Sequence, residues 1–349
     1  MWALTNQTPF AAERGGARDR TGAEVWIVVV KGTFLIQADG SIELAEKQEP
    51  VLVAPVYQGK PGHSSLHYDA DLVLTKPTTD ILLHGHAYAP DSQPVSSVDV
   101  SLSVASVRKT LRVFGDRRWE LGWSKPELLE PEPFLKMPLV YERAYGGQHG
   151  DPLKHDSRNP IGRGFVARKS DLAGQLAPNI EYPEGPDRPA GFGPLCSYWS
   201  PRRERAGTYD TAWQESRHPL PPADFDDRFF QAAPDDQQAN GYLRGGEDVE
   251  LINLSPERFL RFRLPRVALG FVTRLERERV DHRANLHTVV IEPDQRRVLL
   301  VWQTALPCHY DIYRLKRTQV YLKRLRTGLE PDYSSQSQSG ARVARWKTA

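Results

Sequence analysis

The 349-residue chain is long enough to bury a sizeable hydrophobic core in one large domain or two smaller ones. Its 46 Lys and Arg residues against 44 Asp and Glu residues leave a formal net charge of +2, which lacks the positive excess that a nucleic-acid backbone requires. Its two cysteines, Cys196 and Cys308, exclude a disulfide framework and a four-cysteine zinc site and suit a reducing cytoplasm. We therefore expect no nucleic-acid partner.

The sequence also lacks an apolar stretch of membrane length. The longest clearly apolar run, residues 25–30, covers about a third of what a membrane span needs. The N-terminal residues lack the long apolar core of a signal peptide. We therefore expect no membrane partner and a cytoplasmic location.

Short runs rich in Val, Thr and aromatic residues, separated by Gly and Pro, predict an all-β fold that is mainly antiparallel and has little helix. In a first lobe, residues 1–128, we predict buried strands at residues 24–37 and 78–90. Val and Leu alternate with Ser and Asp over residues 98–104. This alternation predicts a half-buried strand, followed by another strand at residues 110–114.

The periodicity largely disappears in the middle region, residues 129–246, where Gly and Pro interrupt the chain every few residues. One short helix is predicted at residues 224–233, with Asp224 as its N-cap and Pro234 as its stop. The rest of the region is predicted to be loops that are held by their own aromatic side chains. They join and pack on two β-sandwich-like lobes.

Strands resume in the second lobe, residues 247–326, where residues 287–291 and 297–302 predict a hairpin joined by the turn EPDQR. The tail, residues 327–349, is polar and rich in Ser and Gln, which predicts disorder. The end of the tail contains Arg342, Arg345, Trp346 and Lys347. This basic end is either solvated or a docking motif that orders on binding.

His84 and His86 are the main signal for a metal site. Residues two apart in a strand project from the same face, so their rings can ligate one ion. The third ligand would come from one of four nearby residues: His63, His67, Asp69 or Asp71. This stretch has no recognisable metal-ligand spacing. We therefore expect packed or surface histidines, and predict no metal and no cofactor.

The two cysteines give little sign of nucleophilic catalysis. The sequence around Cys196 matches no nucleophile turn, and we expect a buried, inert thiol. Cys308 precedes His309, but neighbours in a strand point to opposite faces.

Carboxylates leave one enzymatic alternative open. Glu142, Asp210 and Glu247 lie near aromatic residues, as in glycoside hydrolysis on a β-sandwich, although the sequence does not fix their separation. The alternative function is a carbohydrate-active or metal-dependent hydrolase. A structural component that assembles as a symmetric oligomer is a weaker one.

Arginine and aromatic residues are concentrated in three segments: YERAYGG (141–147), RNPIGRGF (158–165) and YWSPRRERAGTYDTAW (198–213). A guanidinium stacks on aromatic rings and forms paired hydrogen bonds with carboxylates, so such clusters both fix loops and form binding surfaces. The sequence favours these two roles about equally. The residues predicted to contact a partner are Arg143, Tyr145, Arg163, Phe165, Trp199, Arg202, Tyr209, Asp210 and Trp213.

Seven segments occur in order along the chain: WALTNQTPF, VWIVVVKGTF, YERAYGG, NPIGRGF, AGFGPLCSYWSPR, AGTYDTAW and FFQAAPDDQ. Together they resemble a bacterial family of unknown-function domains encoded beside type VI secretion spike genes. The resemblance covers roughly residues 2–325 and leaves out the tail.

This resemblance implies a cytoplasmic adaptor or chaperone. Such a protein holds a toxic effector with its PAAR-type tip and helps to load it onto the VgrG spike. The resemblance therefore implies a binding protein without catalytic activity. It carries over no cargo site at the level of residues.

Overall fold

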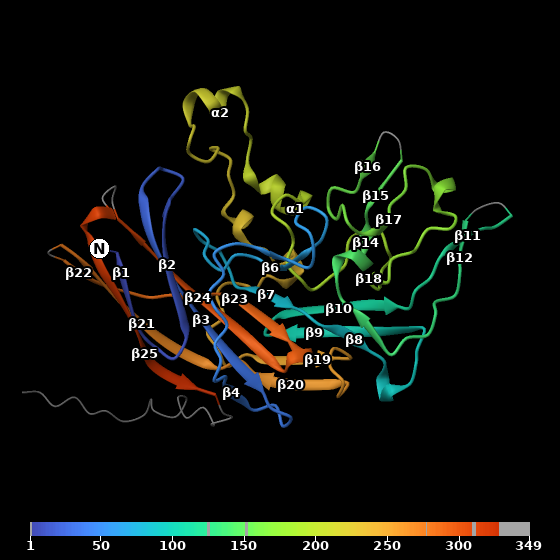
Figure 1. Ribbon diagram of the computed structural model, residues 1–349, viewed down its shortest axis with the longest axis horizontal. Helices are drawn as coiled ribbons and strands as arrows, with labels where there is room; N and C mark the ends of the chain where they lie inside the picture. Colours follow the sequence, from blue (N-terminus) through green and yellow to red (C-terminus); the bar gives the residue numbers. More distant parts are fainter. Residues whose placement is uncertain (1, 124–125, 151–152, 277, 309–311, 328–349) are drawn as a thin grey trace, which may run out of the picture.

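The computed structural model describes residues 2–123, 126–150, 153–276, 278–308 and 312–327 (Figure 1). The architecture is mostly β, with several mainly antiparallel sheets and few helices, which confirms the predicted fold class. None of the helices in these ranges is long and apolar enough to cross a membrane. His309 and the predicted docking motif of the tail lie outside the described residues.

The central sheet has six strands. Their order is β2 (Ala11–Arg18), β3 (Glu24–Ile36), β24 (Arg297–Pro307), β23 (Asn285–Glu292) and β7 (Asp80–Leu83), with β4 (Ile42–Leu44) paired to β3. β3 is covered on both faces: Val28 and Val30 belong to the main core, whereas Ile27 and Val29 belong to a second cluster. Burial on both faces explains why this strand reads as a continuous apolar run.

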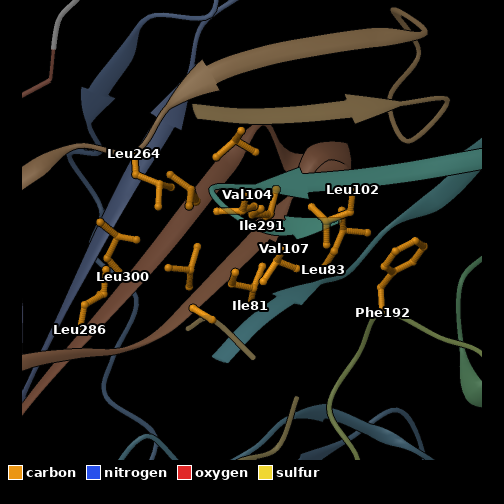
Figure 2. Close-up of a cluster of buried hydrophobic side chains, with 14 of the residues drawn as sticks. Ile81, Leu83, Leu102, Val104, Val107, Phe192, Leu264, Leu286, Ile291 and Leu300 are labelled. Atoms are coloured by element: carbon orange, nitrogen blue, oxygen red, sulfur yellow. The ribbon is translucent and has the colours of Figure 1, made fainter. Parts of the chain in front are cut away.

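A five-stranded sheet packs against the central sheet. Its order is β18 (Ile180–Glu181), β10 (Val107–Phe114), β9 (Ser97–Val104), β19 (Asp248–Ile252) and β20 (Phe259–Arg263). The apolar side chains of β9 alternate with more exposed polar ones, as predicted. Figure 2 shows Leu102, Val104 and Val107 of this sheet beside Ile81, Leu83, Ile291 and Leu300 of the central sheet. The main core therefore lies between the two sheets.

A four-stranded sheet contains both ends of the described chain (Figure 1). Its order is β1 (Ala3–Gln7), β25 (Leu315–Arg326), β21 (Arg266–Leu275) and β22 (Arg279–His282). β1 and β25 are parallel, and β25 and β22 are each antiparallel to β21.

The two ends of the sequence share all three large sheets. β3 pairs with β24, β9 with β19, and β1 with β25. This interleaving differs from the expectation that residues 1–128 and 247–326 build separate lobes. Hydrophobic periodicity reports which face of a strand is buried, but it carries no information on partners so distant in the sequence.

Short ladders and single helical turns occupy the loop-rich parts of the chain, and the last two of the small strand pairs lie wholly within the middle region. The small strand pairs are β5 (Val56–Tyr57) with β6 (Leu66–Tyr68), β8 (His86–Tyr88) with β13 (Lys136–Pro138), β11 (Trp119–Leu121) with β12 (Pro126–Leu128), β14 (Tyr145–Gly146) with β17 (Arg163–Gly164), and β15 (Gln148–His149) with β16 (Lys154–His155). The two short α-helices are α1 (Ser200–Arg203) and α2 (Thr211–Ser216).

The helix predicted at residues 224–233 is shorter than expected. The structure has a 3-10 helix at Asp227–Phe230, and the carboxylate that caps it belongs to Asp226. Asp224 instead accepts hydrogen bonds from the backbone N–H and the hydroxyl of Thr208, at 3.0 and 2.8 Å. The predicted N-cap was therefore wrong, because this carboxylate closes a loop rather than starting a helix.

Candidate functional site

Two of the arginine-rich segments, residues 141–147 and 158–165, pack directly against each other. β14 and β17 pair in parallel, with Tyr145 opposite Arg163. The side-chain amide of Asn159 donates to the carbonyl oxygens of Tyr141 and Tyr145, both at 2.9 Å. A Cβ on Gly146 would lie 2.2 Å from the carbonyl oxygen of Asn159, and its φ is +140°. Glycine is therefore required at position 146, where the two segments pack against each other.

Arg143 and Arg163 converge on one amide. Nη1 of each donates to the Oδ1 atom of Asn179, at 3.2 and 2.9 Å, and Arg143 also binds Asp116 at 2.9 Å. Burial acts to raise the pKa of Asp116, but the bonds from Asn179 and Arg143 outweigh it and lower the pKa. The two arginine side chains remain 23% and 24% exposed. They fix the loops and still reach the surface.

Tyr145 and Phe165 are half-buried beside this pair. The Arg158 guanidinium lies 5.9 Å from the centroid of the Tyr145 ring. The backbone N–H of Phe165 donates to the carbonyl oxygen of Gly146 at 3.0 Å. Both residues therefore belong mainly to the loop scaffold, with part of each side chain accessible.

Trp199 and Arg202 are buried. The Trp199 ring meets Tyr141 edge-on at 5.3 Å. Nη1 of Arg202 donates to Asp69 at 2.8 Å and to the carbonyl oxygen of Leu195 at 2.7 Å, and Nε donates to the carbonyl oxygen of Phe229. Burial leaves neither side chain open to a partner in this structure. These two predicted contact residues lie in the scaffold.

The remaining three predicted residues lie on a projecting loop, residues 208–224, which we call the α2 arm (Figure 1). Asp210 caps α2 by accepting a hydrogen bond from the Trp213 backbone N–H at 2.8 Å. The Tyr209 side chain is 57% exposed, and its ring lies 4.7 Å from that of Trp213. At the base of the arm, Thr208 binds Asp224. The result is a loop with close ends that presents an aromatic pair.

The structure separates the two histidines of the predicted metal pair. β7 ends at Leu83 and β8 begins at His86, so His84 and His86 do not belong to one strand. The Nε2 atom of His84 is buried, and this burial, aided by His67, lowers the pKa of the side chain to about 3. His86 is partly exposed, and its Nδ1 lies 2.6 Å from Asp294. The expectation that both rings leave the same face was wrong, because the strand is interrupted between them.

Three of the four proposed third ligands have other partners, and the fourth, His63, is exposed. Asp69 binds Arg202, and Asp71 binds Lys31 at 2.9 Å. His67 binds Gln58 and lies with its ring 4.8 Å from that of His84. Within the described ranges, no group of three or more His, Cys, Asp or Glu side chains is arranged to hold a metal ion.

The other catalytic signals are also dispersed. Cys196 is buried, as predicted, and burial raises the pKa of its thiol to about 11. Glu142 accepts hydrogen bonds from Ser65, Asp210 caps α2, and Glu247 accepts from the Arg244 backbone N–H. Each carboxylate thus serves a separate local contact.

Comparison with known proteins gives one match. The model of DUF2169, described as an uncharacterized protein conserved in bacteria, matches residues 21–303. The chain belongs to the DUF2169 family. No curated protein and no solved structure matches it. The family match begins after β2 and ends within β24, so β1 and β25 of this DUF2169 chain lie outside the matched residues.

A buried polar network within the residues matched to DUF2169 was not predicted from the sequence. Nζ of Lys109 donates to Asp236 at 2.9 Å and to Gln237 at 2.8 Å. Burial lowers the pKa of Lys109 to about 8, against the opposing effect of Asp236. A signal was present, because Lys109 lies at the inward position between Val107 and Leu111. This network ties β10 to the end of the middle region, and we assign it to the scaffold.

Proposed function

We propose that this protein is a cytoplasmic adaptor or chaperone of a bacterial type VI secretion system. It binds an effector, its PAAR-like tip protein, or both, and helps to load the cargo onto the VgrG spike without catalysis. The resemblance of seven segments to a family encoded beside spike genes supports this function. The structural observation that supports it best is the exposed Tyr209 side chain of the α2 arm, which packs against the half-buried Trp213 ring.

An exposed tyrosine on an ordered loop is suited to protein recognition. Tyr supplies a large contact area with few rotatable bonds, and it is enriched where interfaces concentrate their binding energy. Tyr209 is 57% exposed, whereas Trp199, in the same arginine-rich segment, is fully buried. We therefore assign cargo contact to the α2 arm and support of the arm to the buried part of the segment.

Hydrogen bonds fix the arm both to the body and internally. Arg217 donates through Nη2 to the carbonyl oxygen of Arg20 in the body at 2.7 Å, and through Nε to that of Pro221 within the arm at 2.9 Å. In the segments that flank the arm, Nη2 of Arg205 binds the Asp235 carboxylate at 2.7 and 2.8 Å. An arm ordered in this way loses less conformational entropy when it binds than a free loop would.

Co-expression tests the proposal. The full chain is produced together with the effector and PAAR-like products of neighbouring genes, and complexes are isolated by affinity purification and size-exclusion chromatography. We expect a stoichiometric complex. A stable, folded chain that retains none of these products would contradict the proposed function.

Substitution of Tyr209 tests the role of the arm. We expect Tyr209→Ala to weaken binding of the co-purified cargo by about 2 kcal/mol, the loss typical of an interface anchor. Tyr313→Ala is the matched control, because Tyr313 is 69% exposed and lies outside the arm. If the two variants bound the cargo equally tightly, the arm would not be part of the interface.

A further inference from the structure

The four-stranded sheet carries an unusual concentration of positive charge. Strands β1, β25 and β21 contain no Asp or Glu. They contain seven cationic residues: Arg266, Arg274, Lys316, Arg317, Lys323, Arg324 and Arg326. The whole chain has a net charge of only +2, so this charge is segregated rather than general.

The burial pattern shows which face of this sheet is turned outward. Thr273, Thr318 and Val320 are fully buried on the inner face. Arg274 and Arg317 are the strand neighbours of two of these residues, and both are exposed. Because successive side chains in a strand point to opposite faces, Arg274 and Arg317 lie on the outer face.

Three arginines lie side by side across this outer face. The register places Arg274 opposite Arg317 on one side and opposite Arg279 on the other. Arg279 binds Asp281 at 3.2 Å. In the part of the chain that the structure describes, neither Arg274 nor Arg317 forms an ion pair. Like charges directly opposite each other on adjacent strands are destabilising, so this arrangement calls for an anionic partner.

A shallow hollow adjoins the arginine row. Its volume is about 340 Å³, and it is lined by Gln7, Val272, Arg274, Arg279, Gln319 and Tyr321. The amide of Gln319 donates to Oε1 of Gln7 at 2.6 Å. The hydroxyl end of Tyr321 lies over Gly270, where a Cβ would come 2.4 Å from the Cζ atom of the tyrosine. The hollow is therefore polar and ordered, and its lining contains no carboxylate.

We infer that this outer face, which we call the arginine face, binds an acidic segment of a protein partner. Guanidinium groups bind carboxylates through paired, charge-assisted hydrogen bonds, and the row offers several such groups at the spacing of adjacent strands. A short acidic segment needs only a few of these contacts, whereas a nucleic-acid backbone requires contacts to many phosphates, and the row has three arginines, of which Arg279 already binds Asp281. A protein segment is therefore the favoured occupant.

This inference goes beyond the adaptor proposal. The arginine face is distinct from the α2 arm, and two of its four strands lie outside the family match. Figure 1 shows the sheet at the left of the molecule and α2 at the top. If one of the two surfaces binds no partner, the proposal for the other surface still stands, so the two proposals are tested separately.

Fluorescence anisotropy of the full chain tests the inference at low salt. The probes are labelled oligoglutamate, oligolysine and single-stranded DNA of equal length. We expect oligoglutamate to bind most tightly, and we expect Arg274→Gln/Arg317→Gln to weaken its binding about ten-fold or more. The control is Lys47→Gln/Arg168→Gln, which removes two exposed cations outside the sheet and should leave binding unchanged.

Thermal unfolding distinguishes lost binding from lost folding. Removing two of three adjacent like charges relieves repulsion, so the double variant should melt no lower than the wild type. Loss of binding with unchanged or raised thermal stability supports the inference. Wild-type-like binding by the double variant, or tighter binding of DNA than of oligoglutamate, would overturn it.

Discussion

Nε1 of Trp213 donates a hydrogen bond to the carbonyl oxygen of Leu220 at 2.8 Å. This bond closes the α2 arm on itself and sets the position of the Trp213 ring, which also meets His218 at 5.3 Å. Leu220 in turn contacts Gly22 of the body, where a Cβ would lie 3.3 Å from the leucine side chain. Trp213 therefore organises the arm, while Tyr209 beside it presents the more exposed surface.

The hydrogen bond is tested by Trp213→Phe, which keeps an aromatic ring and removes the donor. We expect the arm to become more susceptible to limited proteolysis, because a net contribution of about 1 kcal/mol is lost locally. The melting temperature of the body should change little, since the arm lies outside the main core.

Trp199→Phe is the contrasting variant, because Trp199 is fully buried in the main core. It should lower global stability through loss of packed volume. If Trp213→Phe lowered the melting temperature as much as Trp199→Phe, the arm would be part of the core rather than an appendage.

Much of the fold could be predicted where periodicity is strong. The alternation over residues 98–104 gives β9, and the predicted hairpin corresponds to β23 and β24, which pair from Asn285 opposite Gln303 to Glu292 opposite Arg297. The pairing of β3 with β24 could not be predicted. It depends on which buried strands complement each other in three dimensions, and one sequence contains no record of that choice.

The binding residues were harder to predict than the strands. Trp199 and Tyr209 occur in one arginine-rich, aromatic segment, yet one is fully buried and the other is exposed. The segment has no regular period, so nothing in its spacing separates an inward from an outward side chain. The arginine face was missed for a related reason, because the row of Arg274, Arg279 and Arg317 exists only once the strand register is fixed.

Acid sensitivity follows from the burial of His84. Its pKa is lowered to about 3 in the folded chain from an ordinary value of 6.5. Between these values the unfolded chain binds a proton that the folded chain does not, so the free energy of unfolding falls as the pH falls below 6.5. This side chain alone accounts for about 1.4 kcal/mol per pH unit.

His84→Leu should therefore flatten the pH dependence of stability between pH 6 and 4, as measured by urea unfolding at each pH. The stability of the variant near pH 7 should be at least that of the wild type, because the substitution also removes a buried Nε2 atom that has no hydrogen-bond partner among the described residues. His155→Gln, at an exposed position, is the control. An unchanged acid slope in His84→Leu would show that other groups govern the transition.

The close packing of the two arginine-rich segments, residues 141–147 and 158–165, depends on Gly146. This residue combines a φ of +140° with a contact so close that a Cβ would lie 2.2 Å from the Asn159 carbonyl oxygen. An alanine there must both adopt an unfavourable backbone conformation and push the strands apart. We expect Gly146→Ala to lower the free energy of unfolding by about 3 kcal/mol or more, measured by urea denaturation.

Gly174 separates these two effects. Its φ is +80°, but a Cβ there would meet nothing within 4 Å, so Gly174→Ala has the conformational cost alone. That cost is about 1–2 kcal/mol for an L residue in the left-handed region. Equal destabilisation by the two variants would show that glycine is required at position 146 for its backbone conformation rather than for its close contact with Asn159. Suppose that Gly146→Ala loses more free energy of unfolding than Gly174→Ala and that its Arg143 and Arg163 loops become susceptible to proteolysis. This result would show that the close packing at Gly146 holds the arginine pair in place.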